Sequence, residues 1–237
     1  MSNLLFDRLF GCHEGETKAF LMFADGTQQS YDTFLRQTAR FANVIEQLGL
    51  VVGDRLAVQI EKSAEALALY AACVQSGVIF LPLNTAYTPA EISYFVSDSG
   101  AKLLIADQNF DLADVASKHR VALEHLNADG SGSFCDLAQN ASDQFATAER
   151  GGDDLAAFLY TSGTTGRSKG AMLTQKNLLS NAETLVSEWR FDDKDVLLHA
   201  LPIFHTHGLF VATNIILLSK ATMIFLPKYA SNADIFK

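Results

Sequence analysis

The sequence has little of what marks secreted or membrane-spanning proteins. Its three cysteines, Cys12, Cys73 and Cys135, are odd in number, lie far apart and form no CxxC pair, so we expect no disulfide framework. The N-terminus lacks the basic and apolar stretches of a signal peptide, and no apolar run reaches about 18 residues. These absences predict a soluble cytoplasmic protein with reduced thiols.

Positive charge is also scarce. The chain has 18 Lys and Arg against 27 Asp and Glu, a formal net charge of −9, and no basic run. This balance predicts no general affinity for nucleic acid or anionic membranes, because both partners need a basic face. With 4 prolines, 15 glycines and 49% hydrophobic residues, the collagen-like, low-complexity and disordered classes are excluded. What remains is a globular chain of 237 residues, enough for one large domain or two small ones.

The sequence does contain an alternation of short apolar runs and helical patterns. Runs that are apolar at nearly every position are typical of strands in a parallel sheet covered by helices. Expected strands are residues 55–60, 78–83, 102–106, 154–160, 195–200 and 221–226, and expected helices are residues 31–48, 63–76, 88–99, 174–189 and 204–219. The predicted fold class is α/β, with doubly wound, mostly parallel sheets flanked by helices. Trp189 and the many phenylalanines are expected in the core.

Two further segments bear on domain organisation. Residues 127–152 mark either a weak subdomain boundary or, as we favour, a surface loop with a short helix. Residues 231–237 begin like a helix, but the sequence stops after about one turn, which is too short to be stable alone. We therefore expect residues 1–237 to be a piece of a longer chain. A truncated layer of helices should leave a sheet face or edge exposed, which favours association.

The chemistry is concentrated in residues 161–170, which read TSGTTGRSKG. Gly163, Gly166 and Gly170 permit backbone conformations closed to other residues, so several N–H groups can converge on an anion. The hydroxyls of Thr161, Ser162, Thr164 and Thr165 add donors, and Lys169 adds a positive charge. This combination, placed directly after a strand, suits a polyphosphate.

Other interpretations of this run fit less well. A Walker A motif ends in Gly-Lys-Ser/Thr, whereas here Ser168 precedes Lys169 and Gly170 follows it, and the run is not a Rossmann GxGxxG. A flexible surface loop can have the same composition, which alone is a weak signal. The order of the residues is much more specific than their composition.

The ordered run resembles the phosphate-loop signature of the adenylate-forming superfamily of acyl-CoA synthetases, luciferases and peptide-synthetase adenylation domains. Ser168 replaces the usual proline, a departure that we expect to loosen the loop slightly. Two other segments resemble the upstream and downstream motifs of the family, residues 71–84 and 201–208. In three segments, residues 81–87, 161–172 and 199–210, the amino-acid sequence is especially similar to that of malonyl-CoA synthetases. The resemblance covers essentially the whole chain.

The resemblance implies an AMP-forming acid–thiol ligase that activates malonate with ATP as malonyl-AMP and then transfers it to coenzyme A. The residues implied in phosphate binding are Thr161, Ser162, Gly163, Thr164, Thr165, Gly166 and Lys169. One of the hydroxyls, assigned to Thr165, would reach Mg²⁺. Residues 1–237 would be the N-terminal part of the large domain. The adenine-binding motif, the ribose-binding Asp and the C-terminal domain with the catalytic Lys would lie beyond, so the isolated chain should be inactive or nearly so.

Two histidines follow the same resemblance. His205 matches the family position near the adenylate and the acyl carboxyl, which implies a catalytic and substrate-binding role; the alternative is a capping or core histidine. His207 is assigned to the distal carboxylate of malonate, since a histidine is easily protonated beside an anion. A metal pair at these two positions is not favoured, because no third ligand lies at suitable spacing. No role is expected for His13, His119, His125 and His199.

Three alternatives stay open at this point. The chain could belong to a ligase for another short carboxylate, such as methylmalonate or acetate. It could be a non-catalytic nucleotide-binding fragment, or a P-loop NTPase, although the position of Lys169 argues against the last. The expected partners are small-molecule substrates, with no nucleic acid and no membrane, and either the rest of the same polypeptide or a second copy.

Overall fold

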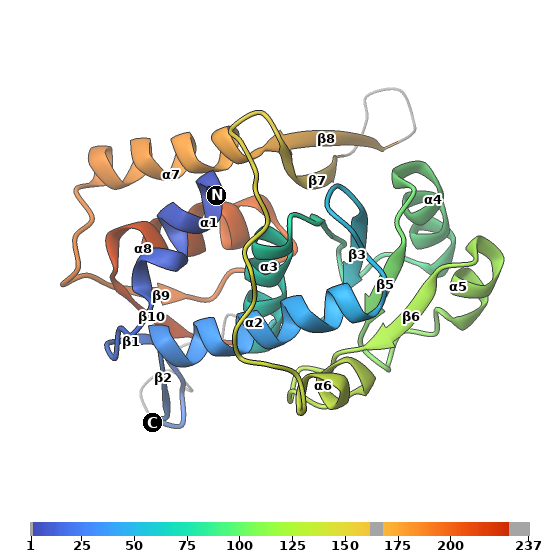
Figure 1. Cartoon of the computed structure of the whole chain (residues 1–237), viewed down its shortest axis with the longest axis horizontal. Coiled ribbons are helices and arrows are strands. Elements are labelled where there is room, and N and C mark those ends of the chain that lie inside the picture. Colours follow the sequence, from blue (N-terminus) through green and yellow to red (C-terminus); the bar gives the residue numbers. More distant parts are fainter. Residues whose placement is uncertain (1, 162–167, 228–237) are drawn as a thin grey trace.

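Two β-sheets form the framework of the protein (Figure 1). The computed structural model describes residues 2–161 and 168–227, so the helix predicted at residues 231–237 lies outside the described residues. The strands are β1 (Ala19–Met22), β2 (Gln28–Ser30), β3 (Arg55–Gln59), β4 (Ile79–Pro82), β5 (Leu103–Ala106), β6 (Ala122–His125), β7 (Leu155–Thr161), β8 (Lys169–Thr174), β9 (Val196–His199) and β10 (Thr222–Phe225). Their order is β6-β5-β3-β4-β7-β8 in the larger sheet and β2-β1-β10-β9 in the smaller one.

Helices cover both sheets. They are α1 (Leu4–Leu9), α2 (Tyr31–Gln47), α3 (Ala64–Ser76), α4 (Pro89–Ser99), α5 (Ala113–His119), α6 (Ser133–Ala138), α7 (Gln175–Trp189) and α8 (Asn214–Ser219), with a short 3₁₀ helix η1 (Gly11–His13) and a π-helix η2 (His207–Thr213). None of the helices in the described part of the chain is both long and apolar enough to cross a membrane. The three cysteines are unpaired.

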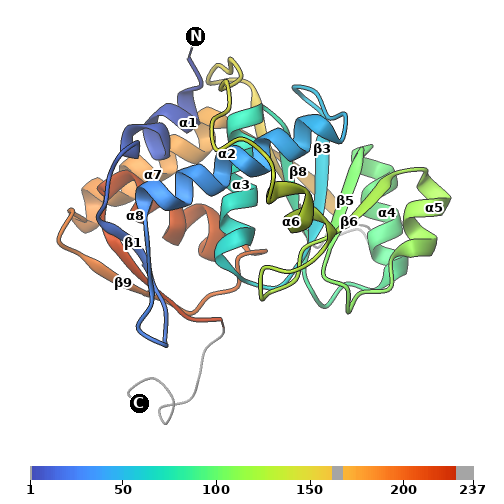
Figure 2. The same cartoon turned by 60° about the horizontal axis from the view of Figure 1, so that its bottom comes forward.

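The larger sheet confirms the predicted doubly wound arrangement. Strand β3 pairs in parallel with β4 on one side and β5 on the other, and β4 pairs in parallel with β7. Alternate residues of each strand enter different cores: Leu56 and Val58 face α2 and α3, whereas Ala57 faces α4. Figure 2 shows α4 and α5 on the side of this sheet away from α2 and α3. Strands buried on both faces explain why the sequence pattern is continuously apolar.

Local signals define the helix boundaries as predicted. The Ser63 hydroxyl accepts a hydrogen bond from the backbone N–H of Ala66, and α3 ends at Gly77, whose φ is 72°. Helix α4 begins with a capping box between Thr88 and Glu91 and ends at Gly100. Capping satisfies backbone groups that a helix end would otherwise leave unpaired. Helix α3 is buried from residue 66 to residue 76 because it lies between the two sheets.

The smaller sheet joins segments that are far apart in the sequence. Strand β1 pairs in parallel with β10, with Leu21 opposite Met223, and β10 pairs in parallel with β9. The buried Tyr31 hydroxyl donates to the carbonyl oxygen of Ala221 at 2.6 Å. Strands β1 and β2 were not among the sequence predictions, because four apolar residues in β1 and three polar residues in β2 are too few to show a periodic pattern.

The structure refines or corrects several expectations from the sequence. Trp189 is not in the core: it is 57% exposed, because the last turn of α7, residues 187–190, is exposed throughout. The predicted helix at 204–219 is divided into the π-helix η2 and α8. Residues 169–174, which carried no strand prediction, form β8 antiparallel to β7. Residues 127–152 include the short helix α6, whose buried Phe134 lies 5.0 Å from Phe41 between ring centroids.

Both sheets have an edge strand that leaves apolar side chains exposed. Residues 169–172 of β8 are exposed, and Met172 has 64% of its surface accessible. On β9, Val196 and Leu198 point to the same face and are 56% and 49% exposed. Exposed apolar side chains on a sheet edge favour pairing with other chains.

We predict that the chain associates reversibly at high concentration. Val196→Lys together with Leu198→Lys should weaken this association, because charge on an edge strand opposes edge-to-edge pairing. Sedimentation velocity over a concentration series measures it. Glu183→Lys on α7 serves as a charge control that leaves the β9 edge intact. Monomeric behaviour of the parent chain at every concentration would contradict the prediction.

Candidate active site

The predicted phosphate-binding run connects two antiparallel strands. Thr161, the last residue of β7, lies opposite Lys169, the first residue of β8, and both side chains are exposed. The structure therefore brings a hydroxyl and an ammonium group together at the base of the connecting segment. The other predicted phosphate ligands, Ser162, Gly163, Thr164, Thr165 and Gly166, lie outside the described residues.

Helix α4 supports the base of this hairpin. The Tyr160 hydroxyl donates to Asp98 Oδ2 at 2.6 Å, and the Tyr94 hydroxyl donates to the carbonyl oxygen of Ser168 at 3.1 Å. The Phe95 ring centroid lies 4.4 Å from that of Tyr160. Burial and then Asp98 raise the pKa of Tyr160, which keeps its hydroxyl a donor. These contacts hold the strands on both sides of the predicted loop.

Parallel pairing determines what lies beside the hairpin. Because β3, β4 and β7 run in the same direction, their carboxyl ends meet at one edge of the sheet. The segment after β9 packs onto that edge: Ile203, Phe204 and Leu209 line a narrow apolar crevice with Ile60, which follows β3, and Leu83, which follows β4. The two predicted histidines are in this segment.

His205 and His207 are exposed and lie next to each other. Their rings are stacked with centroids 5.3 Å apart and an angle of 13° between ring planes. His205 Nδ1 is 3.4 Å from both the backbone nitrogen and Nδ1 of His207. If His205 Nδ1 accepts both hydrogen bonds, its proton is on Nε2, which is then a free donor. The described residues contain no group of three or more His, Cys, Asp or Glu side chains that could hold a metal ion.

A third histidine, for which no role was expected, fixes the chain beside this pair. His199 is 1% exposed, and its Nε2 donates to the carbonyl oxygen of Gly208 at 2.8 Å. A Cβ on Gly208 would lie 2.1 Å from the carbonyl oxygen of Pro202, so only glycine fits there. Burial, and then the nearby Lys62, lower the pKa of His199 to about 4. Spacing in the sequence carries no signal for these contacts, because Lys62 and His199 meet only in the folded protein.

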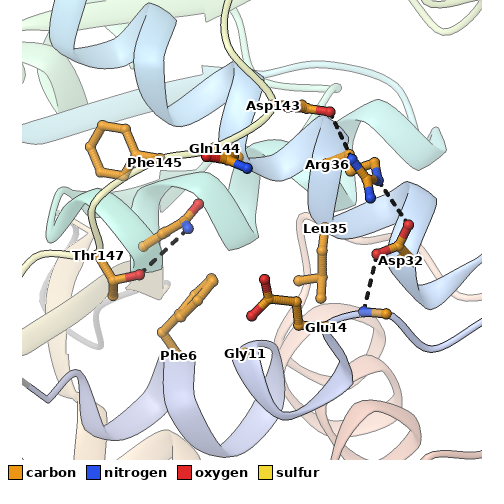
Figure 3. A pocket seen from close by; sticks show the side chains of 13 residues that line it. Phe6, Gly11, Glu14, Asp32, Leu35, Arg36, Asp143, Gln144, Phe145 and Thr147 are labelled. Carbon is orange, nitrogen blue, oxygen red and sulfur yellow. Dashed lines mark hydrogen bonds and ion pairs between the residues drawn. The ribbon is translucent and has the colours of Figure 1, made fainter.

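A larger hollow elsewhere in the molecule is not part of this site. It has a volume of about 530 Å³ and lies between α1, α2 and the segment before β7, lined in part by Phe6, Gln75 and Phe145 (Figure 3). Its guanidinium, Arg36, is paired with Asp32 at 2.8 Å and Asp143 at 2.9 Å. No sequence-predicted site residue lines it, and its cation is already neutralised by two carboxylates.

Comparison with known proteins agrees with the sequence and the fold. The profile of the family described as AMP-binding enzyme matches residues 12–237. The chain belongs to this family. The structure of ATP-bound MatB from Rhodopseudomonas palustris is 52% identical, with a TM-score of 0.93 over 97% of this chain and 46% of that chain. The family assigned from residues 71–84, 161–170 and 201–208 and the α/β fold predicted from the alternation of strands and helices are thus confirmed.

The curated relatives that this chain resembles include two plant CoA ligases. The probable CoA ligase CCL9 of Humulus lupulus is 33% identical over 175 residues, which cover 71% of this chain and 33% of the relative. The malonate–CoA ligase of Arabidopsis thaliana is 28% identical over 228 residues, which cover 87% of this chain and 37% of the relative. The chain therefore spans less than half the length of MatB and of both ligases.

We predict that the neutral state of His199 makes the free energy of unfolding fall as the pH is lowered. The folded pKa is about 4 against an ordinary value of 6.5, so the unfolded chain takes up this proton first. The stabilisation is complete above pH 6.5, the pKa of histidine in the unfolded chain. It is lost as the pH falls from there through the folded pKa of about 4. A shift of this size corresponds to on the order of 3 kcal/mol. Urea unfolding at several pH values between these limits measures it.

His199→Gln is the matched control for this prediction. Glutamine does not titrate in this range, so the variant should lose less stability than the parent over the same pH interval. Burial also lowers the pKa of His13, but this group is present in both proteins and cancels in the comparison. Equal losses in the two proteins would show that His199 is not held neutral.

Proposed function

We propose that this chain is part of an ATP-dependent acid–thiol ligase that converts malonate to malonyl-AMP and then to malonyl-CoA in the cytoplasm. The observation that carries the proposal is the placement of Thr161 and Lys169 opposite each other across the TSGTTGRSKG run, in a member of the AMP-binding enzyme family. Malonate as substrate is supported by the likeness of residues 81–87 and 199–210 to malonyl-CoA synthetases, and by the malonate–CoA ligase among the relatives.

The first half-reaction brings an anion to a polyanion. A carboxylate oxygen of malonate attacks the α-phosphorus of Mg-ATP, the bond from that phosphorus to the β-bridging oxygen breaks, and pyrophosphate leaves with the electron pair. Charge repulsion opposes the approach, so donors held in place beforehand lower the barrier. Lys169 and the hydroxyl of Thr161 are such donors toward the β- and γ-phosphates. The contacts of Tyr160 and Tyr94 with α4 and Ser168 limit the reorganisation that binding requires.

The two exposed histidines supply donors on the acyl side. With the proton of His205 on Nε2, this nitrogen can donate to the carboxyl group that becomes activated. His207 in its protonated form keeps its Nδ1–H directed at His205 Nδ1 and retains Nε2–H for the distal carboxylate. In the second half-reaction the thiolate of coenzyme A attacks the acyl carbon, and AMP leaves with the electron pair.

The remaining parts of the reaction are assigned to a longer polypeptide. We place the adenine- and ribose-binding groups, a further cation for the second carboxylate and a mobile C-terminal domain in it. The supporting fact is that this chain spans 46% of MatB. We propose that residues 1–237 supply the N-terminal part of the large domain. This part includes one wall of the acyl site and the phosphate hairpin, which is formed by β7, β8 and the phosphate-binding run between them.

The test of the proposed function is malonate-dependent exchange between ATP and labelled pyrophosphate by the complete polypeptide. We predict that Lys169→Ala lowers kcat/KM for the exchange by about 100-fold, in the range found when a charge-stabilising donor is removed. His205→Ala should also lower it. Lys102→Ala, at an exposed position before β5, is the matched lysine control and should leave the rate unchanged.

The outcomes of this assay separate the open alternatives. Exchange that depends on methylmalonate or acetate but not on malonate would keep the ligase and change its substrate. ATP binding without any exchange would indicate a non-catalytic nucleotide-binding protein. Exchange unaffected by both Lys169→Ala and His205→Ala would show that the assigned residues are not the site.

We further predict that purified residues 1–237 do not form malonyl-CoA at an enzymatic rate. The reason is that donors around only part of the nucleotide leave its other groups solvated and poorly oriented, and orientation supplies much of catalysis. Chromatographic detection of malonyl-CoA from malonate, Mg-ATP and coenzyme A measures the rate. The complete polypeptide, assayed in parallel, is the positive control, and comparable rates for the two would refute the prediction.

A further inference from the structure

A buried lysine lies beside the segment after β9 that carries His205 and His207, residues 203–209, called the histidine segment from here on. Lys62 follows β3 and precedes α3, and it is 8% exposed. Its Nζ lies 2.7 Å from His199 Nδ1 and 2.8 Å from the carbonyl oxygen of His199, and 4.4 Å from the centroid of the Phe225 ring. No carboxylate among the described residues forms an ion pair with Lys62.

This environment is costly for a cation. A buried ammonium group without a carboxylate loses its hydration and regains only part of it from neutral acceptors and an aromatic ring. Burial accordingly lowers the pKa of Lys62 to about 7. An apolar side chain would fill the same space at less cost, so packing alone does not account for a lysine here.

The hydrogen bonds of Lys62 lead directly to the candidate active site. By donating to His199 Nδ1, Lys62 requires the proton of the imidazole to be on Nε2, which donates to the carbonyl oxygen of Gly208. The same carbonyl accepts from the Thr213 hydroxyl at 3.0 Å. Gly208 follows His207, and the backbone N–H of Leu209 donates to the carbonyl oxygen of His205 at 3.0 Å.

We propose that Lys62 and His199 are positioning residues, whose hydrogen-bonded pair holds the main chain at Gly208 and thereby orients His205 and His207 toward the acyl substrate. The catalytic consequence rests on the proposed function; the structural coupling does not. Because Lys62 comes from the carboxyl end of β3, the pair ties the histidine segment to the sheet that carries the phosphate hairpin. In this way the two halves of the site keep a fixed relation to each other.

Amide hydrogen exchange of the Leu209 N–H, measured by NMR on the chain, tests the coupling. We expect Lys62→Met and His199→Leu to accelerate this exchange by about tenfold relative to the amide of Leu104, which lies in the interior strand β5. His199→Gln should remain within about twofold of the parent, because its amide can still accept from Lys62 and donate to Gly208. Lys102→Met is the matched lysine control and should show no change.

The comparison of the two His199 variants separates positioning from packing. If His199 only filled space, leucine and glutamine would disturb Leu209 to the same extent, and that result would overturn the proposal. So would unchanged exchange at Leu209 in both Lys62→Met and His199→Leu. Should Lys62→Met fail to fold, the His199 pair alone decides the question, because both variants leave Lys62 in place.

A second measurement connects the coupling to catalysis. In the complete polypeptide, Lys62→Met and His199→Leu should lower kcat of malonate-dependent exchange about tenfold, since misplaced groups lose orientation. KM for ATP should stay within about twofold, because the phosphate hairpin is untouched. A parent enzyme without malonate-dependent exchange would refute the proposed function and leave the Leu209 result standing. Accelerated Leu209 exchange with unchanged kcat would refute the positioning role.

Discussion

The parallel pairing of β3, β4 and β7 is the constraint on which the candidate site depends. Each of these strands is too short to place a functional group on its own, and their contributions are separated by tens of residues in the sequence. Because these strands pair in parallel, their carboxyl ends lie at the same end of the sheet. The end of β7 presents Thr161, the end of β4 leads to Leu83, and the end of β3 leads to Lys62. A site built from these residues exists only because the strands share a direction.

The groups assigned to chemistry and the groups that support them differ sharply in burial. Lys169, His205 and His207 are exposed, as ligand-binding side chains must be before the ligand arrives. Their supports are partly or fully buried: Tyr160 beneath the hairpin, and Lys62 with His199 beneath the histidine segment. Buried hydrogen bonds are stronger and more directional than exposed ones, since little water competes for them. In this arrangement the buried supporting residues are held rigidly, while the side chains assigned to chemistry remain accessible to the ligand.

The same division explains where the fold is least regular. Segment 207–213 is a π-helix, a geometry that is often found at functional sites because it departs from ideal hydrogen bonding. It begins at His207 and contains Gly208, whose lack of a Cβ permits the close approach of the Pro202 carbonyl. The regular α-helix α8 begins at Asn214, and its residues 214–217 are buried in the core. In this helical segment the irregular backbone is thus at the end that begins with His207, next to His205.

The sequence by itself determined the fold class, most boundaries of α3, α4 and α7, and the family. Capping residues such as Ser63 and Thr88 act on their own neighbours, and an apolar run signals burial wherever it packs, so both can be recognised without knowing the fold. The TSGTTGRSKG run was recognisable for the same reason, since its order lies within ten consecutive residues. Neither the exposed position of Trp189 nor the strand β8 could be recognised in this way. Each depends on how far a neighbouring structural element extends, which the local sequence does not show.

Tertiary structure alone decided which distant residues serve the site. The sequence around His199 gives no indication of its partners, yet folding buries it between Lys62 and Gly208. The physical reason is that these contacts depend on the register of two sheets and on the helix between them, and not on any local preference. Patterns repeated along a chain can be read from the chain, whereas a hydrogen bond across 137 residues arises only once the core has packed.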